Sequence, residues 1–516
     1  MAANKQLKEL ALSYGEARSR YNSLVTYREA LEKTWEDCSK LTLPYLFPSS
    51  SHTESTTFDT PYNSIGPASV NNLASKLLLA LLPASGNFFR LIPLEEAVAE
   101  LSTDEQVQLD KELSKLEKGI NTMIDTQALR VPMYEALKYL IVTGNVMLYK
   151  VKNGGIKIFN PYEYVVSRDY VGNVVEIGIK EKVAKNTLPQ DILDQIDESP
   201  DRDKSTEVEE LEVYTSIIMY SSDKWFVYQE IDDVLIEKSL KEYSTPDLPY
   251  LPLRWTNTFS ESYGRGLVEQ YLGDLRSLEG LTKIILDGAG AAARVIFGIR
   301  PAATTKLEDL QAARNGDAIV GDLDRDITVL KVDKGMDLQV PFNLMGQLEM
   351  RLNRAFLNVQ GGVRDSERTT AVEVRATIAE LEAALGGTYS VLAQELQLPL
   401  LRLLLKEANP QVLKITEPSI VTGASAISRE RDLQNLTMMV QSMAQLGPDV
   451  VGQFLKVDGY LRQVATALGI DPDLVVKSQE QLQQEQQMAM QQQQAMMQQE
   501  QSGAVQLERE KQKGKQ

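Results

Sequence analysis

Residue types that commonly do chemistry in proteins are scarce in this chain of 516 residues, which has one histidine and one cysteine. His52 lies in the Ser/Thr-rich stretch 49–57 with no nucleophile motif beside it, which favours an exposed bystander over a catalyst. Cys38 follows Trp35 in a helical pattern and is predicted to be packed rather than reactive. These two residues cannot form an internal disulfide or a Cys/His metal site. We therefore predict no catalytic residue, no metal site and no cofactor.

Two glycine patterns could in principle cradle a phosphate. The run GAGAAA at 288–293 matches the dinucleotide-binding pattern G-x-G-x-x-A, which needs a strand before it and a helix beginning at the glycines. Residues 278–286 are instead predicted to be helical and no ribose-binding acid follows, so the run favours helix packing. The pattern GRG at 264–266 is weaker, because Glu269 stands where a third small residue belongs. No P-loop motif is present, so an ATPase working with this protein would be another chain.

Two further motifs carry charge. Asp322, Asp324 and Asp326 have the D-x-D-x-D spacing of a calcium loop, but the required glycine and terminal glutamate are absent, which favours a solvated acidic loop. The stretch 363–368, VRDSER, interleaves two cations with two anions. It is either a polar linker between helices or a channel constriction that attracts phosphates through its arginines and limits retention through its acids. The residues alone leave both interpretations open.

Long helical patterns surround this stretch. The first runs from Leu267 to about Phe297, the second covers 345–359, and the third begins at Thr369 and continues towards Ala408, with bends expected at 386–387 and at Pro399. Between the first two lies a mixed block, for which we predict a helix at 307–313 and strands at 318–320 and 327–332.

Small residues crowd the first long helix, at Gly280, Gly288, Gly290, Ala291 and Ala292. Each glycine weakens a helix by about 1 kcal/mol relative to alanine. Close approach of a neighbouring helix would offset that cost, so we predict that these residues lie at a helix–helix contact.

The remaining patterns predict a fold of the α+β class that is mainly α. Helices are expected at 5–38 (one or a pair), 64–82, 103–139 (divided near Val131-Pro132), 427–446 and 450–468. Short β-like runs are expected at 146–151, 156–159, 164–166, 174–179, 209–220, 225–229 and 234–238, with Pro246, Pro249 and Pro252 closing that region. The Gln- and Met-rich stretch 479–501 is predicted to be an exposed helix or a mobile tail, and 508–516 to be disordered.

Bulk composition limits the possible functions. The length predicts two to four domains, and we find neither a membrane-spanning run nor a signal peptide. The formal net charge is −18, from 54 Lys and Arg against 72 Asp and Glu. This balance argues against a protein that grips nucleic acid by neutralising phosphates. It is compatible with a channel that nucleic acid passes through, or with simple solubility.

One order of motifs resembles a known family. SYGRG at 262–266 opens the first helix, RLNRAF at 351–356 lies in the second, and ERTTAVEV at 367–374 opens the third. Together with Trp35 and PYLFP at 44–48, this order resembles the portal proteins, or head-to-tail connectors, of short-tailed phages (podoviruses). The resemblance covers about residues 1–475 and leaves the Gln/Met-rich tail unmatched.

The resemblance implies a phage portal fold with wing, stem, clip and crown regions, assembled as a ring. The implied regions are a wing (1–261), a first stem helix (262–298), a clip (299–340), a second stem helix (341–359), a tunnel loop (360–368), a long wing helix (369–408), a crown (409–477) and the tail (478–516). In the tunnel loop, the residues implied to face the DNA channel are Gly361, Gly362, Arg364, Asp365, Glu367 and Arg368. In the clip, those implied to contact the terminase or the tail are Lys306, Asp309, Arg314, Asp322, Asp324 and Arg325. In the first stem helix, the small residues from Gly280 to Ala292 are implied to pack against the stem helix of the next subunit.

The implied function is a dodecameric ring at one capsid vertex, non-enzymatic, through which DNA is packaged and later ejected through the tail. The implied partners are further copies of the chain, double-stranded DNA, the terminase large subunit, a tail adaptor, and capsid and scaffolding or internal core proteins, without a membrane. The implied location is the virion, after assembly in the host cytoplasm. The alternatives are another oligomeric virion scaffold or adaptor without DNA passage, and a nucleotide-binding enzyme that rests on the glycine run alone.

Overall fold

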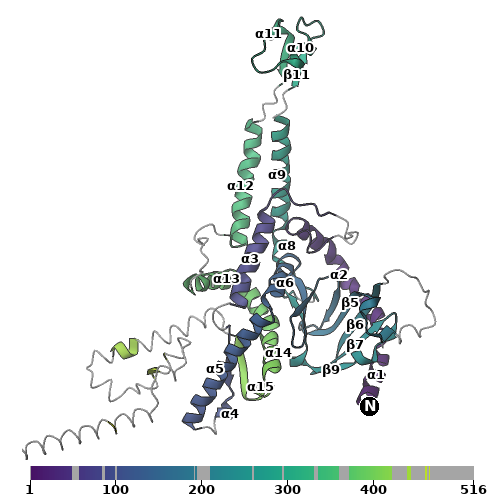
Figure 1. Ribbon diagram of the computed structural model, residues 1–516, viewed down its shortest axis with the longest axis vertical. Coiled ribbons are helices and arrows are strands. Elements are labelled where there is room, and N and C mark those ends of the chain that lie inside the picture. Colours follow the sequence, from purple (N-terminus) through teal and green to yellow (C-terminus); the bar gives the residue numbers. More distant parts are fainter. Residues whose placement is uncertain are drawn as a thin grey trace, which may run out of the picture. The chain divides into compact units, whose positions relative to one another are not determined.

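The structure is a computed structural model of the full chain. It describes residues 2–48, 57–83, 88–98, 102–190, 192–193, 210–258, 261–292, 296–330, 335–358, 371–420, 438–442, 460–461, 464 and 488. The chain divides into two compact units, Met1–Val421 and Thr422–Gln516, and everything below concerns the first. In its described part this unit mixes helices and strands and is mostly helical, as the sequence predicted (Figure 1). None of the helices described has the length and apolar character needed to cross a membrane.

Helices occur along the whole first unit. They are α1 (Ala2–Tyr14), α2 (Ala17–Lys40), α3 (Ile65–Leu81), α4 (Glu95–Val98), α5 (Thr103–Thr126), α6 (Arg130–Thr143), α8 (Leu267–Gln270), α9 (Leu272–Ala292), α10 (Leu307–Ala312), α11 (Leu323–Asp326), α12 (Gly335–Ala355), α13 (Ala371–Leu392), α14 (Leu398–Ala408) and α15 (Val412–Ile415). The predicted helical pair at the N-terminus is confirmed, since Gly15 at φ +82° separates α1 from α2. The predicted division beside Val131-Pro132 is confirmed as the break between α5 and α6.

The strands form four antiparallel sheets. They are β1 (Phe89–Pro93), β2 (Asn145–Lys150), β3 (Ile156–Phe159), β4 (Tyr164–Arg168), β5 (Val174–Ala184), β6 (Glu210–Ser221), β7 (Lys224–Ile231), β8 (Val234–Leu235), β9 (Lys241–Ser244), β10 (Tyr250–Arg254), β11 (Ile296–Ile299), β12 (Ile327–Leu330) and β13 (Thr416–Ile420). The largest sheet has the order β4-β5-β6-β7-β8 with β9 also on β7; the others are β10-β2-β3, β1-β13 and β11-β12. The sequence missed β10, which passes through Pro252, and proline is tolerated there because β10 is an edge strand.

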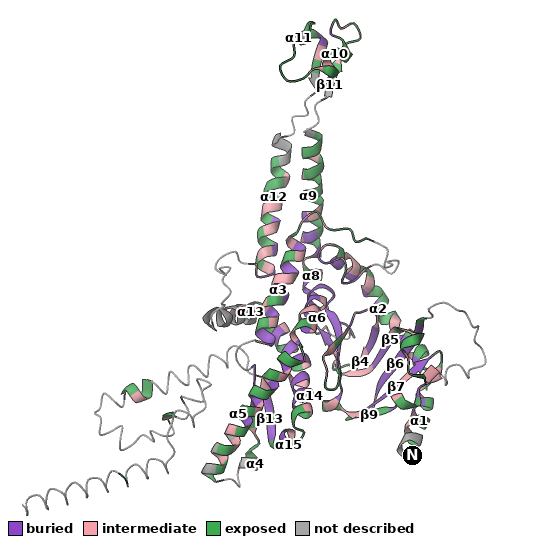
Figure 2. Cartoon of the chain, viewed as in Figure 1, coloured by how far each residue is buried: buried purple, intermediate pink, exposed green. Residues whose placement is uncertain are grey.

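Two packed regions make the core (Figure 2). In one, α2 lies against the largest sheet, where Trp35 is fully buried among strand residues such as Ile177 and Ile217. In the other, α3 and α6 pack with β2, β10 and the helices α13 and α14, around leucines such as Leu73 and Leu404. The near ends of α9 and α12 join this second region, because Leu278 and Leu352 are buried in it.

Three predictions for the long helices and the block between them are wrong. The first helix ends at Ala292 rather than near Phe297, because Phe297 pairs with Val329 across β11 and β12. Residues 318–320 form no strand, and Val320 is 88% exposed. The second helix starts at Gly335 rather than Met345, and it includes Pro341 in its second turn. The implied clip boundary at residue 340 therefore falls inside α12.

The third long helix is interrupted where Pro399 follows. Five residues, Ala393–Gln397, form a π-turn between α13 and α14. Proline has no N–H to donate and its ring crowds the carbonyl four residues earlier, here that of Glu395, so the regular helix is disturbed. The bend predicted from Pro399 thus corresponds to this π-turn, whereas α13 runs as regular helix through Gly386 and Gly387. The predicted helices 427–446 and 450–468 and the tail 478–516 lie almost wholly outside the described residues.

Candidate functional site

Of the single cysteine and the single histidine, the structure describes only the cysteine. Cys38 is buried, as predicted, and burial raises the pKa of its thiol to about 12, so it is an inert packing residue. His52 lies outside the described residues. Among the residues that are described, no cluster of three His, Cys, Asp or Glu side chains is arranged to hold a metal ion.

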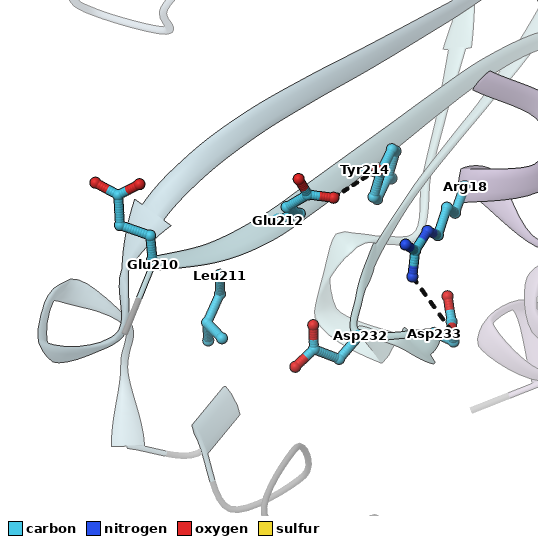
Figure 3. A pocket seen from close by; sticks show the side chains of 7 residues that line it. All are labelled: Arg18, Glu210, Leu211, Glu212, Tyr214, Asp232 and Asp233. Atoms are coloured by element: carbon cyan, nitrogen blue, oxygen red, sulfur yellow. Dashed lines mark hydrogen bonds and ion pairs between the residues drawn. The ribbon is translucent and has the colours of Figure 1, made fainter. Parts of the chain in front are cut away.

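A shallow acidic pocket lies between the start of α2 and the largest sheet (Figure 3). It is lined by Arg18, Glu210, Leu211, Glu212, Tyr214, Asp232 and Asp233. Hydrogen bonds from Lys180 and from the Tyr214 hydroxyl, the latter 2.7 Å long, hold the pKa of Glu212 below its usual range. A general acid needs the opposite shift, so the environment of Glu212 does not suit that role.

Where the sheets meet the long helices, three glycines allow backbone segments to cross in direct contact. Gly144 ends α6 at φ +79°, and a Cβ there would lie 2.4 Å from the backbone nitrogen of Gly266. A Cβ on Gly266 would lie 2.7 Å from the carbonyl oxygen of Val142, and one on Gly264 would lie 2.8 Å from that of Thr256. Only glycine fits at these contacts. The pattern at 264–266 is therefore a close-packing motif and not a phosphate loop.

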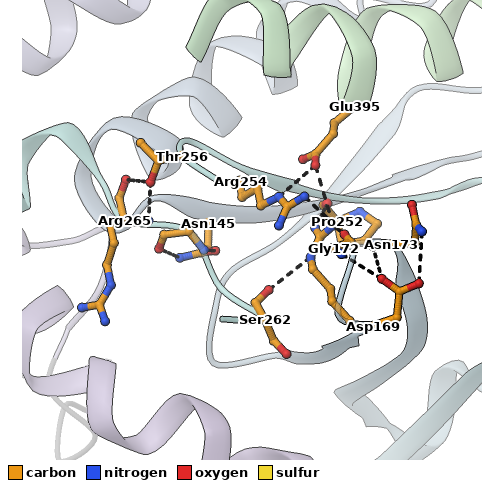
Figure 4. Close-up of polar contacts among 12 residues, drawn as sticks. Asn145, Asp169, Gly172, Asn173, Pro252, Arg254, Thr256, Ser262, Arg265 and Glu395 are labelled. Carbon is orange, nitrogen blue, oxygen red and sulfur yellow. Dashed lines mark hydrogen bonds and ion pairs between the residues drawn. The ribbon is translucent and has the colours of Figure 1, made fainter. Parts of the chain in front are cut away.

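Two side chains fix the chain as it leaves this crossing towards α8 (Figure 4). The Asn145 amide donates to the carbonyl of Gly264 at 2.8 Å, and its Oδ1 accepts from the Gly264 N–H at 2.7 Å. The Thr256 hydroxyl bonds both backbone groups of Arg265, at 3.0 and 3.1 Å. Each side chain thus imitates a neighbouring strand and sets the direction in which the first long helix starts.

Two buried guanidinium groups share one carboxylate beside this junction (Figure 4). Arg254 Nε donates to Glu395 Oε1 at 2.9 Å, and Arg168 Nη1 lies 3.7 Å from the same oxygen. Burial lowers the pKa of Arg168 to about 10. The cluster ties β4 and β10 to the π-turn. Sequence reasoning missed it, and only the proline at 399 signalled an irregular turn nearby.

The helices α9 and α12 lie side by side and run antiparallel (Figure 1). Arg351 pairs with Asp274 at 2.9 Å, and Thr282 contacts Met345, so rising numbers in α9 match falling numbers in α12. The GAGAAA run lies in and directly after α9, with helix before it and no strand. This overturns the nucleotide-binding interpretation, which needs the glycines at the start of a helix.

Two of the predicted packing glycines, Gly280 and Gly290, have no packing partner in the described part of the chain. A Cβ added at Gly280 or Gly290 would meet no atom within 4 Å. Gly288 is half-buried and Ala291 is exposed, while the side chain of Ala292 is outside the described set. The close approach predicted for these residues is therefore not made by α12.

An extended segment crosses one side of the helix pair. The Glu279 carboxylate accepts from the backbone N–H of Tyr62 at 2.8 Å and of Asn63 at 3.2 Å. The Asn63 side chain reaches Thr282 and Glu349, at 3.5 and 3.4 Å. Residues 57–63 thus mark one flank of the pair, and the Arg351–Asp274 ion pair lies on another.

Large apolar side chains remain exposed on the part of the pair beyond this segment. They are Ile284 (56%), Leu286 (53%), Val340 (72%), Phe342 (59%) and Leu344 (46%). Isolated exposed apolar residues are ordinary, but five on two adjoining helices form a surface suited to contact with another protein.

The charged residues predicted in the intervening block are exposed: Lys306, Asp309, Arg314, Asp322, Asp324 and Arg325. Asp326 is not, which corrects the prediction of a wholly solvated acidic loop. Its Oδ2 accepts from the hydroxyl and backbone N–H of both Thr304 and Thr305, and these bonds hold its pKa below the usual range. Asp326 therefore holds the block together.

The predicted tunnel-loop residues, Gly361, Gly362, Arg364, Asp365, Glu367 and Arg368, lie outside the described residues. The chain is described up to Asn358, shortly after α12 ends at Ala355, and again from Ala371 at the start of α13.

Comparison with known proteins gives one consistent result. The profile of a family described as bacteriophage head to tail connecting protein matches residues 14–476. The portal protein of Enterobacteria phage T3 is 37% identical over 489 residues, which cover 92% of this chain and 91% of the relative. The portal protein of Escherichia phage T7 is 36% identical over 492 residues, covering 93% and 91%. That of Enterobacteria phage SP6 is 28% identical over 488 residues, covering 93% and 94%.

Proposed function

Because the chain belongs to the family of bacteriophage head to tail connecting proteins, we propose that it serves as the portal of a short-tailed phage. Copies of the chain, twelve being the number that the resemblance implies, close into a ring at one capsid vertex. Double-stranded DNA enters the head through the ring during packaging and leaves through the tail at infection. The role is structural, and the chemical energy for packaging comes from the terminase.

The proposed partners follow from this position. Inside the head these are capsid and scaffolding or internal core proteins; outside, the terminase large subunit docks first and a tail adaptor later. The exposed charged residues of the block between α9 and α12, such as Lys306, Arg314 and Asp322, are the surface we assign to the two external partners. Assembly takes place in the host cytoplasm, and the finished ring is a component of the virion.

The main structural support for a ring comes from the helices α9 and α12, which we assign as the stem. Seven residues make about two turns, so residues seven apart lie on one side of a helix. Leu286 is seven after Glu279 and Phe342 is seven before Glu349. The segment 57–63 contacts both glutamates, so Leu286 and Phe342 lie on that same flank, two turns further along. They present a joint apolar surface there.

The second flank is apolar too. Arg351 pairs with Asp274 on the side of the helix pair away from Glu349. Leu344 is seven residues before Arg351 and therefore lies on that side, and Val340 is one turn further along. Two different apolar flanks on one helix pair fit a heterologous contact, in which one flank of each copy covers the other flank of the next. Such contacts close into a ring when the rotation between copies divides a full turn.

The charge of the chain supports DNA passage. With a net charge of −18, most of the ring repels phosphates, so DNA can slide with few sites that hold it. We assign residues 360–368 as the loop that reaches the DNA. Arg364 and Arg368 attract phosphates there, while Asp365 and Glu367 limit how long the contact lasts.

A mass measurement tests the proposal directly. Native mass spectrometry and negative-stain imaging of the purified protein should show a closed assembly of twelve or thirteen copies with a central opening. A monomer, or an assembly without an opening, would overturn the proposal and would leave a scaffold or adaptor without DNA passage as the remaining candidate.

The DNA contact has its own test. Replacing Arg364 and Arg368 together by alanine should leave the ring intact but change the amount of DNA packaged or retained, because the only cations of 360–368 are lost. Ring mass and nuclease-protected DNA per particle are the two measurements. Normal packaging and retention in the double variant would refute the contact, while the mass result would still stand.

A further inference from the structure

The helix α3 carries polar residues beside a buried apolar face. Ser69, Asn72 and Lys76 are spaced i, i+3 and i+7, so they lie on one face. The residues around them, such as Leu73 and Leu77, are buried in the core. Burying part of a polar stripe beside a core is costly unless each group is hydrogen-bonded, so the stripe should have a defined partner.

That partner is the turn that directly follows α12. The Asn72 amide donates to Asn358 Oδ1 at 2.6 Å, and the Asn358 amide donates to the Ser69 hydroxyl at 2.7 Å. Lys76 Nζ donates to the carbonyl oxygen of Leu357 at 2.7 Å. The last carbonyls of a helix lack partners and carry partial negative charge, so a lysine is well suited to this position.

The backbone at this point forms a helix C-cap. Leu357 has φ +57°, in the left-handed region that leucine rarely adopts, and its side chain is buried. The Leu357 N–H donates to the carbonyl of Arg354 at 3.2 Å and the Asn358 N–H to that of Asn353 at 2.7 Å, which is the usual pattern of such a cap. The contacts from α3 hold the Leu357–Asn358 peptide from outside in addition to these two bonds.

Lys76 also reaches the next helix. Its Nζ lies 3.6 Å from Glu380 Oε2 on α13, and its side chain is only 16% exposed. The chain is described up to Asn358 and again from Ala371. One ammonium group therefore contacts the element before residues 359–370 and the element after them, and the two anchor points are held by the same turn of α3.

We propose that Lys76, supported by Asn72 and Asn358, is a positioning residue that joins the turn after α12 to the middle of α13, and so holds together the two described elements that flank residues 359–370. This inference rests on the proposed function only where DNA retention is measured, since the contacts themselves do not depend on it.

Hydrogen exchange on the assembled, full-length protein tests the positioning. Lys76→Met keeps the aliphatic stem and removes the charge, and Lys76→Arg keeps a cation. Lys115→Met is the matched control, because Lys115 forms an exposed ion pair with Glu112 on α5. We expect exchange in the peptide 352–358 to rise about tenfold in Lys76→Met, and to stay at the wild-type rate in the other two variants.

A merely structural role would give a different result. If Lys76 only stabilised the fold, Lys76→Met would lower the melting temperature and raise exchange in α6 as much as at 352–358. The positioning role predicts an unchanged melting temperature with exchange raised only near Leu357. Asn358→Ala, which breaks the contacts with Ser69 and Asn72 without changing charge, should give the same local rise. Wild-type exchange at 352–358 in both variants would overturn the proposal.

DNA retention separates this inference from the proposed function. Raised exchange together with lost nuclease-protected DNA in Lys76→Met particles supports both. Raised exchange with normal retention supports the positioning and shows that DNA retention does not depend on it. Unchanged exchange overturns the positioning, and the double arginine variant then decides the DNA role by itself.

Discussion

Single residues at the junction decide the direction in which the first long helix leaves the sheets. Gly144, Gly264 and Gly266 let three backbone segments touch, and Asn145 then hydrogen-bonds across the gap with the geometry of a paired strand. Because the contact is backbone against backbone, no side chain can move aside to accept a Cβ. The three glycines are therefore needed because they have no side chain.

Gly144→Ala should destabilise the fold by about 3 kcal/mol, since the new Cβ would meet backbone atoms and φ +79° disfavours alanine. Chemical denaturation measures the change. The control is Gly119→Ala on α5, where a Cβ meets no atom within 4 Å, and which should stabilise the helix by about 0.5–1 kcal/mol. Equal stabilities for the two variants would contradict the crossing.

At the scale of elements, the block between α9 and α12 is a small unit with its own polar centre. Its strands β11 and β12 form a two-stranded antiparallel sheet, and most of the described surface of the block is exposed. A two-stranded sheet is marginal without further support. Asp326 supplies that support by joining the start of β12 to Thr304 and Thr305.

Asp326→Ala should open this block and leave the rest of the chain folded, because four donors on Thr304 and Thr305 lose their acceptor. We expect hydrogen exchange in 296–330 to rise about tenfold, with the main melting transition unchanged. Asp324→Ala removes an exposed neighbouring carboxylate and should behave like the wild type. Wild-type exchange in Asp326→Ala would show that the carboxylate is dispensable.

At the scale of the whole molecule, a single copy leaves apolar surface on α9 and α12 exposed. The pair α9 and α12 leaves apolar side chains uncovered on two flanks, and the glycines of α9 have open space beside them in the part of the chain that the structure describes. A second copy placed on each side would cover the flanks and bring a helix against the glycines. Oligomer formation is thus the expected completion of the fold.

Phe342→Asp should prevent this completion. The side chain is 59% exposed in one copy, so the subunit should fold normally, while each contact between copies loses about 2 kcal/mol of apolar burial and gains a buried charge. Mass photometry or light scattering should then find monomers and small species. Leu12→Asp, a matched exposed position on α1, should still form the full assembly. A complete ring from Phe342→Asp would place the contact elsewhere.

Much of this protein was determined by local sequence. The helices α2, α3, α5 and α6 and most strands of the largest sheet follow from periodicity and turn residues, because these signals act within a few residues. The order of motifs at 262–266, 351–356 and 367–374 was enough to indicate the family, which the comparisons confirm. The predicted regions of the ring remain predictions.

Tertiary structure decided the rest, because the deciding contacts join residues far apart in the chain. Strand pairing of Phe297 with Val329 ended the first long helix earlier than its periodicity indicated. The pattern GRG became a packing motif only when Gly144 was brought against it. In the sequence, Lys76 is a single charged residue that interrupts the apolar run of α3 without any visible reason. Its carbonyl and carboxylate partners lie some 280 and 300 residues away, at Leu357 and Glu380, and no local pattern can encode a contact across that distance.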